Sequence, residues 1–187
     1  MIKEEFVKKY LNSHIENLFP HDISEKIIQT SELLSAVKKQ GNKVLFFGNG
    51  ASAAIASHAA LDFTKQAKVT SMAFNDAVLL TAFSNDYGYE HWVEHAINYY
   101  GNNGDTGVFI SSSGQSQNII TGAQNARNKG LYIITFSGFE EDNPLKSIGD
   151  INFWVNSRAY NVIENIHQIW LMGICDLIIG KMEYSVK

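Results

Sequence analysis

The chain has 187 residues, of which 45% are hydrophobic and 18% are charged, with only two prolines. This composition predicts one folded domain over residues 1–187 and excludes a disordered chain. The net charge of −4 provides no basic surface for nucleic acid, and every apolar run stops short of the ~18 residues of a membrane span, so we expect neither as a partner.

Two amphipathic helices are predicted at the N-terminus. Residues 3–19 and residues 24–39 both carry apolar side chains at helical spacing. Gly41 and Asn42 then interrupt the pattern. We expect residues 1–40 to form a helical hairpin ahead of an α/β core over residues 41–187.

Short apolar runs alternate with helical segments in the rest of the chain. The predicted strands are residues 43–48, 69–74, 106–111, 131–138 and 151–155. The predicted helices between and after them are residues 51–67, 76–84, 117–130 and 163–181. This alternation predicts a doubly wound α/β fold, a three-layer sandwich with a central parallel sheet. Ligands of such sheets bind at the carboxyl ends of strands, where the strand order reverses.

The loop after the first predicted strand is suited to an anion. It reads Gly48-Asn49-Gly50-Ala51-Ser52 and opens a helix. Glycines allow a tight turn and close approach of a ligand, and the helix N-terminus supplies free N–H groups with a positive dipole end.

A second loop of the same kind follows the third predicted strand. The hydroxyls of Ser111, Ser112, Ser113 and Ser116 surround Gly114 and can hydrogen-bond a phosphate without lysine or arginine. Either loop alone could be an ordinary turn with a helix cap, but two in one sheet favour a phosphate site. Neither matches a nucleotide-binding glycine motif, so no nucleotide cofactor is predicted.

These motifs identify a family resemblance. The pair GNGASA and SSSGQS, with SNDYGYE at residues 84–90 and IENIHQ at residues 163–168, resembles the SIS sugar-phosphate proteins, and within them the phosphoheptose isomerases. The resemblance implies a flavodoxin-like fold and an aldose-ketose isomerase of surface-carbohydrate biosynthesis acting on sedoheptulose 7-phosphate. It also implies a homotetramer with active sites between subunits, often with a Zn²⁺ ion in each.

Residue matching extends the resemblance to the substrate site. The phosphate would be held by Ser52, Ser111, Ser112, Ser113 and Ser116. The sugar hydroxyls would meet Asn49 and Asp86, with Asn75 or Asp76 as further candidates, and Gly50 would allow the close approach.

Acid-base and metal chemistry is predicted on two helices. His58 and Asp62 are four residues apart on one helix, and Glu164 and His167 are three apart on another, so each pair shares a helix face. Imidazoles and carboxylates can move protons or bind a divalent metal. By resemblance, His58, Asp62 and Glu164 are metal ligands, and Asp62 matches the catalytic glutamate of the family.

One departure from the family pattern leaves two hypotheses open. Met172 stands where the family has a second catalytic histidine, and methionine cannot transfer a proton. Either Glu164 or His167 works with Asp62, or the chain is a non-catalytic SIS protein like the DnaA initiator-associating proteins of the DiaA type. The retained Asp62 and Glu164 favour the isomerase, because buried charges are costly without a function or a partner.

The cellular location is predicted from the cysteine and the N-terminus. Cys175 is the single cysteine and has no partner for an internal disulfide, which is typical of a reducing compartment. Residues 1–19 carry charges throughout and lack the apolar stretch of a signal peptide. We therefore expect a cytoplasmic protein.

Overall fold

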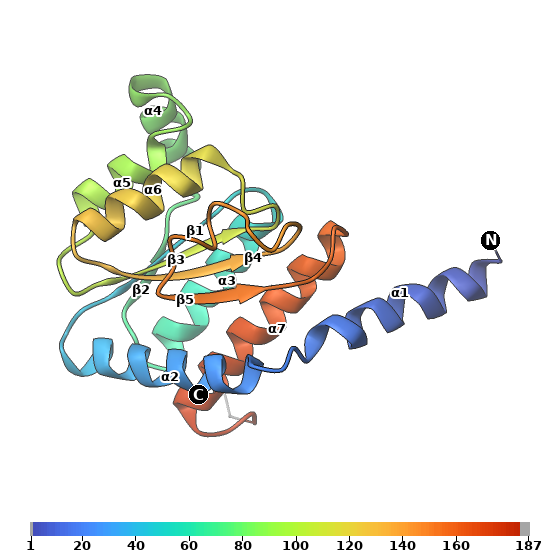
Figure 1. Cartoon of the computed structure of the whole chain (residues 1–187). Coiled ribbons are helices and arrows are strands. Elements are labelled where there is room, and N and C mark those ends of the chain that lie inside the picture. The colour runs from blue at the N-terminus through green and yellow to red at the C-terminus, as the bar shows by residue number, and fades with distance from the viewer. Residues whose placement is uncertain (1, 184–187) are drawn as a thin grey trace.

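The computed structural model describes residues 2–183, and its core is a five-stranded parallel sheet covered by helices on both faces (Figure 1). The strands are β1 (Val44–Gly48), β2 (Ser71–Ala73), β3 (Thr106–Ser111), β4 (Tyr132–Ser137) and β5 (Ile151–Trp154). The helices are α1 (Lys3–Leu18), α2 (Ile23–Lys39), α3 (Ala51–Lys65), α4 (Ala77–Tyr87), α5 (Trp92–Tyr100), α6 (Gln117–Asn128) and α7 (Tyr160–Ile179). The doubly wound three-layer prediction is confirmed.

The strand order β2-β1-β3-β4-β5 determines where a ligand can bind. The chain moves outward from β1 to β2 in one direction and from β3 through β4 to β5 in the other, so the order reverses between β1 and β3. Because β1 and β3 are paired neighbours, the loops that follow them leave the same edge of the sheet side by side. The crevice between those loops is the expected ligand site of an open α/β sheet.

Alternating side chains of the strands fill two hydrophobic cores. On one face, Phe46 and Ile110 pack with residues of α2, α3 and α7. On the other face, Phe47 and Phe109 pack with residues of α5 and α6. Since the strands are buried on both faces, they appear in the sequence as continuous apolar runs.

Helix α7 is the most apolar helix of the core. Within residues 2–183 it is also the one helix whose length and composition would allow a membrane span, a test that a core helix passes equally well. Its residues Ile163, Ile166 and Trp170 are at most 2% exposed and pack into the first of the two cores. The apolar character of α7 is therefore accounted for by burial on this side.

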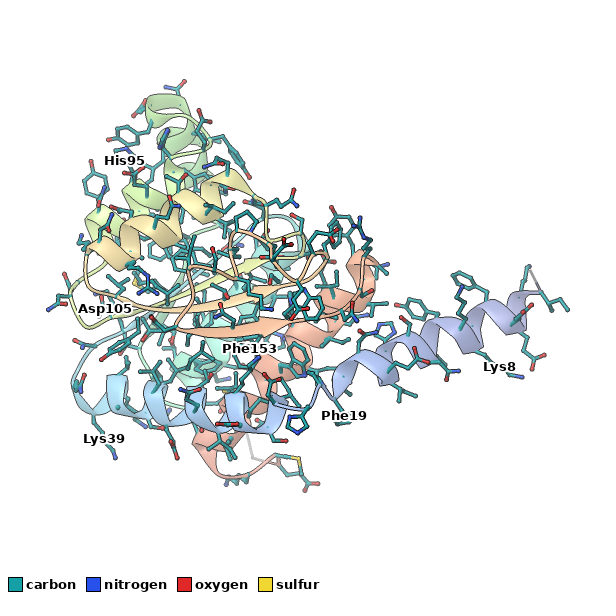
Figure 2. The ribbon with its side chains drawn as sticks, in the orientation of Figure 1. Lys8, Phe19, Lys39, His95, Asp105 and Phe153 are labelled. Carbon is teal, nitrogen blue, oxygen red and sulfur yellow. The ribbon has the colours of Figure 1, made fainter. Side chains whose placement is uncertain are left out.

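The expected N-terminal hairpin is not formed. Helix α1 extends away from the body of the molecule, whereas α2 lies along it (Figure 1). No residue of α1 is buried; Lys8 lies on the projecting helix, and Phe19 lies just after it, where the chain rejoins the body (Figure 2). Helix α2 packs its apolar side, including Leu34 and Val37, on the core beside α7. Helix α1 instead contacts α7, where the Leu18 carbonyl accepts a hydrogen bond from Trp170 Nε1, so α1 and α2 do not pair with each other.

Helix α5 lies where no element was predicted. Trp92, Val93, Ala96 and Ile97 are buried, and they recur at the i, i+1, i+4, i+5 spacing of one helix face. The helix places these side chains in the core beside α6, so that the segment after Gly88 is anchored next to the crevice.

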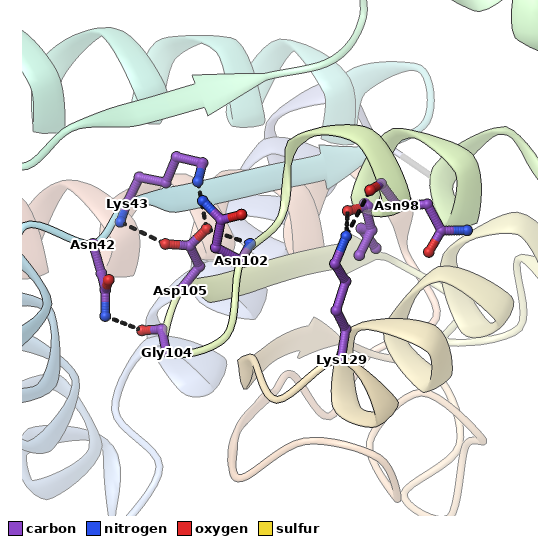
Figure 3. Close-up of polar contacts among 8 residues, drawn as sticks. Asn42, Lys43, Asn98, Asn102, Gly104, Asp105 and Lys129 are labelled. Carbon is purple, nitrogen blue, oxygen red and sulfur yellow. Dashed lines mark hydrogen bonds and ion pairs between the residues drawn. The ribbon is translucent and has the colours of Figure 1, made fainter.

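A buried carboxylate joins the starts of β1 and β3. Asp105, 1% exposed, accepts hydrogen bonds from the backbone N–H of Lys43 and of Asn102, and from the Lys43 ammonium at 2.6 Å (Figure 3). Asn42 donates to the Gly104 carbonyl beside it. This cluster joins the N-terminal ends of β1 and β3. The crevice lies at the opposite, carboxyl ends of the same two strands.

We predict that Asp105→Ala lowers the free energy of unfolding by about 3 kcal/mol, because it leaves two backbone donors and a partly buried ammonium without their acceptor. Guanidinium unfolding followed by circular dichroism measures the change. Glu141→Ala, which removes an exposed ion pair with Lys146, is the matched control and should change the value by less than about 0.5 kcal/mol. A loss at Asp105 no larger than the control would contradict the prediction.

Candidate functional site

The β1–α3 loop brings its backbone close to the start of α3. A Cβ atom on Gly48 would come within 2.6 Å of the Ser52 backbone, so no larger residue fits there. Gly50 has φ +54°, a conformation that favours glycine, and it caps α3 without a side-chain hydrogen bond. The N-terminal end of α3 therefore offers backbone N–H groups to an anion.

The β3–α6 loop places its serine hydroxyls on the other side of the crevice. Ser111 and Ser112 are buried, and the Ser111 hydroxyl donates to that of Ser116 at 3.1 Å. Gly114, at φ +66°, lies against Asn143, whose Oδ1 atom would be 2.0 Å from an added Cβ. The tight packing under Gly114 holds the serines at the rim of the sheet.

The two loops line one shared cavity of about 130 Å³. Its lining residues are Asn49, Ser52, Ile110, Ser111, Ser112, Ser113, Ser116, Tyr160 and Glu164. Among these residues there is no lysine or arginine, so an anion would be held by hydroxyl and N–H donors, as the sequence predicts. The predicted phosphate residues are thus brought together in one place.

Glu164 reaches this cavity from the first turns of α7. Ser112 Oγ donates to Glu164 Oε1 at 3.3 Å, and Glu164 is partly exposed to the cavity. A carboxylate therefore lies beside the donors that would hold a phosphate. That position suits a group that exchanges protons with a bound sugar phosphate.

His58 makes one polar contact to α7 and one within α3. Its Nδ1 atom lies 2.9 Å from Gln168 Nε2, and its Nε2 atom lies 3.3 Å from Asp62 Oδ2. Since an amide nitrogen can only donate, Nδ1 is the acceptor and Nε2 carries the proton that faces Asp62. The expected pairing of His58 with Asp62 on one helix face is therefore present.

Further along the same two helices, Asp62 faces a second carboxylate. The pKa of Asp176 is raised by burial and by the neighbouring charge of Asp62. Burial, with smaller contributions from Asp62 and Asp176, raises the pKa of the Cys175 thiol to about 12. Cys175 is thus an unreactive thiol at neutral pH.

The three expected metal ligands do not meet in one chain. Asp62 lies ten residues after Ser52 on α3, which corresponds to about 15 Å along the helix axis. Glu164 contacts Ser112 at the phosphate end instead. Within residues 2–183, no three or more His, Cys, Asp or Glu side chains are placed to hold a metal ion together. His58 and Asp62 lie close enough to supply two ligands of such a site, and Glu164 does not join them.

His167 lies outside the cavity, contrary to its expected catalytic role. It is fully buried between Phe136 and Trp170, and its Nε2 atom donates to the Ser137 carbonyl at 3.0 Å. Burial lowers its pKa to about 4. A neutral, enclosed imidazole cannot exchange protons with a ligand, so His167 supports the core.

The remaining sugar-site candidates have local partners. Asp86 is exposed and accepts from Asn85, and it does not line the serine cavity. Asn75 accepts from the Ser57 hydroxyl, and Asp76 caps α4 by accepting from Val78 and Leu79. Capping accounts for Asp76 without a ligand.

Three residues that the sequence motifs do not single out belong to the site. Tyr160 lines the cavity from the start of α7. Asn118 and Tyr89 both hydrogen-bond to Asn49. Asn118 lies on α6, two residues beyond the serine motif, and Tyr89 lies inside the SNDYGYE motif. Neither position in the sequence indicates that the two side chains both hydrogen-bond to Asn49.

Comparisons with known proteins agree with this geometry. The family model described as the SIS domain matches residues 8–138. A relative named probable phosphoheptose isomerase, from Thermoplasma acidophilum, is 32% identical over 93% of this chain and 98% of its own length. The phosphoheptose isomerase of Aneurinibacillus thermoaerophilus is 34% identical over 90% of this chain and 92% of its own. The structure of phosphoheptose isomerase GmhA from Neisseria gonorrhoeae superimposes with a TM-score of 0.88 at 26% identity, covering 96% of this chain and all of that one.

We predict that changing Ser111, Ser113 and Ser116 together to alanine weakens sugar-phosphate binding by about 100-fold, because several hydrogen bonds to a charged group are lost. Isothermal titration calorimetry with sedoheptulose 7-phosphate measures the affinity. Ser147→Ala, a loop serine that donates to the Pro144 carbonyl, is the control and should leave affinity unchanged. Full affinity in the triple variant would exclude this cavity as the phosphate site.

We predict that His167 makes the fold less stable as the pH falls from about 6.5 to 4. Its pKa is lowered in the folded state, so the unfolded chain binds the extra proton in that window. The slope contributed approaches about 1.4 kcal/mol per pH unit. Unfolding free energies measured at several pH values, for the unmodified chain and for His167→Gln, test this. An unchanged pH slope in the variant would be inconsistent with a neutral His167.

Proposed function

The chain belongs to the SIS-domain family and, within it, to the phosphoheptose isomerases, and we propose its reaction from this membership. The chain interconverts sedoheptulose 7-phosphate, or a closely related ketose phosphate, with its aldose isomer in surface-carbohydrate biosynthesis. The observation that carries the proposal is the single cavity shared by both serine-bearing loops with a carboxylate, Glu164, in its lining. The cytoplasm, where such phosphorylated sugars are found, is the proposed location.

The substrate phosphate is held at the switch point of the sheet. The Ser52 hydroxyl and the N-terminal end of α3 approach it from one side, and the hydroxyls of Ser111, Ser113 and Ser116 approach from the other. This anchoring fixes the far end of the sugar, which raises the effective concentration of its reacting carbons near the acid-base groups.

The isomerisation requires two proton movements. A base removes a proton from C1 of the ketose and returns it to C2, while a proton is exchanged between the two oxygens through an enediol intermediate. We assign the carbon-bound proton to Asp62 and the oxygen-bound proton to Glu164. His58, whose Nε2–H faces Asp62 at 3.3 Å, orients that carboxylate.

Asp62 acts on a substrate held by another copy of the chain. Its position about 15 Å along α3 from Ser52 is too distant for a sugar anchored at the serines of the same chain. The Zn²⁺ ion implied by the resemblance would likewise need ligands from more than one chain, because His58 and Asp62 are not joined by Glu164 here.

Two exposed apolar surfaces support a homotetramer with shared sites. Helix α1 exposes an apolar stripe that the rest of the described chain leaves uncovered, and α7 exposes Ile169 and Leu177. The α1 stripe consists of Phe6, Val7, Leu11, Ile15 and, just after the helix, Phe19. Exposed apolar surface of this extent marks a protein interface. A closed homo-oligomer would cover both surfaces and bring the α3 of one subunit to the cavity of another.

We predict that Asp62→Asn and Glu164→Gln each lower kcat by about 100-fold or more, because each removes a proton-transfer group. Sugar-phosphate affinity should be unchanged or tighter, since both changes keep side-chain size and remove negative charge. An assay for aldose formation and calorimetric binding measure the two quantities. Asp142→Asn, an exposed loop position, is the control and should retain full activity.

Co-expression of two inactive variants tests whether the site is shared. If Asp62 acts on a neighbouring subunit, chains carrying Asp62→Asn mixed with chains carrying the triple serine change should regain part of the activity, because some sites then combine intact partners. No recovery would place both groups in the same chain. Sugar-phosphate binding without turnover in the unmodified chain would instead support the non-catalytic alternative.

A further inference from the structure

Three side chains from separate segments meet beside the phosphate cavity. Asn49, in the β1–α3 loop, and Asn118, in the first turn of α6, exchange two hydrogen bonds of 3.0 and 2.9 Å between their amide groups. Tyr89, in the loop between α4 and α5, donates its hydroxyl to Asn49 Oδ1 at 3.0 Å. Tyr89 takes no part in the proton transfers of the proposed reaction.

Asn49 keeps one hydrogen-bond donor that could serve a ligand. Its Oδ1 atom accepts from both Asn118 and Tyr89, which uses both of its lone pairs. Its Nδ2 atom donates one proton to Asn118 and keeps a second N–H. Asn49 lines the cavity, whereas neither Tyr89 nor Asn118 does, so the free N–H is the group available to a bound ligand.

The amide pair by itself does not determine this orientation. If both amides rotated by half a turn together, the two mutual hydrogen bonds would form again with oxygen and nitrogen exchanged. Asn118 is 2% exposed, so water cannot readily favour either arrangement at its side. In either arrangement the Tyr89 hydroxyl keeps a hydrogen bond to Asn49, because it donates to Oδ1 in the structure and would accept from Nδ2 in the exchanged arrangement. Tyr89 therefore holds the Asn49 amide in place, and an oxygen of a bound ligand selects the arrangement that presents an N–H.

We propose that Tyr89 is a positioning residue whose hydroxyl holds the Asn49 amide at the edge of the cavity, where an Asn49 N–H can donate to the oxygens of the bound sugar phosphate. An N–H attracts phosphate or hydroxyl oxygens, whereas a carbonyl oxygen in its place would repel them. The inference rests on the proposed function for its substrate, but its geometry concerns any phosphate ester held in this cavity.

The location of Tyr89 makes the role separable from folding. Its side chain is 54% exposed, and it follows Gly88, the residue that ends α4 at φ +85°. Asp86, three residues earlier, belongs to the same segment. The hydroxyl contact thus ties the segment that carries Asp86 to the phosphate loop while burying little surface of its own.

The direct test is Tyr89→Phe in the full-length chain, which removes the hydroxyl and keeps the ring. KM for sedoheptulose 7-phosphate should rise about five-fold, equivalent to about 1 kcal/mol, with kcat within about two-fold, because a binding contact is weakened in ground and transition states alike. Tyr99→Phe is the matched control, since the exposed Tyr99 hydroxyl contacts only the Tyr87 hydroxyl in the described hydrogen-bond network and should leave both constants unchanged.

A double variant distinguishes positioning from a general structural effect. In an Asn49→Ala background, Tyr89→Phe should have no further effect on affinity, because Tyr89 acts through Asn49. An equal loss in both backgrounds, or an unchanged KM in the single variant, would overturn the inference. So would a melting temperature lowered by Tyr89→Phe together with an altered kcat.

Binding of inorganic phosphate separates this inference from the proposed function. Calorimetry with inorganic phosphate needs no turnover, so the five-fold weakening in Tyr89→Phe can be measured even in a chain that converts no sugar. Absence of turnover with that weakening present would contradict the isomerase proposal and support the role of Tyr89. If Tyr89→Phe binds inorganic phosphate as tightly as the unmodified chain, and the unmodified chain converts the sugar, the isomerase proposal stands and the role of Tyr89 is contradicted.

Discussion

The pairing of β1 with β3 is the constraint on which the site depends. These strands are neighbours in the sheet, yet the helices that follow them cover opposite faces, α3 in one core and α6 in the other. The two loops must therefore diverge at the carboxyl edge, and the crevice between them is a consequence of connectivity rather than of any one side chain. Asp105 secures the opposite ends of the same strands, so the crevice is supported from below.

The lining of that crevice is polar but carries no positive side chain among the cavity residues. A phosphate held by hydroxyl and backbone N–H groups depends on their orientation, because each donor contributes little unless it points at an oxygen. This explains why the surroundings are so closely packed: Gly48 against Ser52, Gly114 against Asn143, and the Asn49 amide between Asn118 and Tyr89. Because no lysine or arginine lines the cavity, the Glu164 carboxylate has no cationic partner among the lining residues.

The sequence predicted the sheet and the two glycine- and serine-bearing loops at its edge because both rest on local patterns. The continuous apolar runs reflect burial on two faces, and Gly48, Gly50 and Gly114 occupy positions that only a close approach or a positive φ explains. Helix α5 was missed although its apolar spacing is helical. His167 shares a helix face with Glu164 by spacing, but its burial depends on Phe136 and Trp170 from the assembled core. The contact of Tyr89 with Asn49 joins residues that are 40 positions apart, and no periodic pattern in the sequence predicts it.

The order of groups along α3 and α7 separates Asp62 from the serine cavity of the same chain. Both helices start at the carboxyl edge of the sheet, so their polar residues form successive levels: Ser52 with Glu164 at the cavity, His58 with Gln168 below, and Asp62 with Asp176 below that. A helix is rigid over this length, and no side-chain rotation brings Asp62 back to the cavity. The exposed apolar residues of α1 and α7 lie outside the core that α3 and α7 share. We propose that other copies of the chain cover them and bring the Asp62 of one chain to the serine cavity of another, which would link the assembly of the protein to its chemistry.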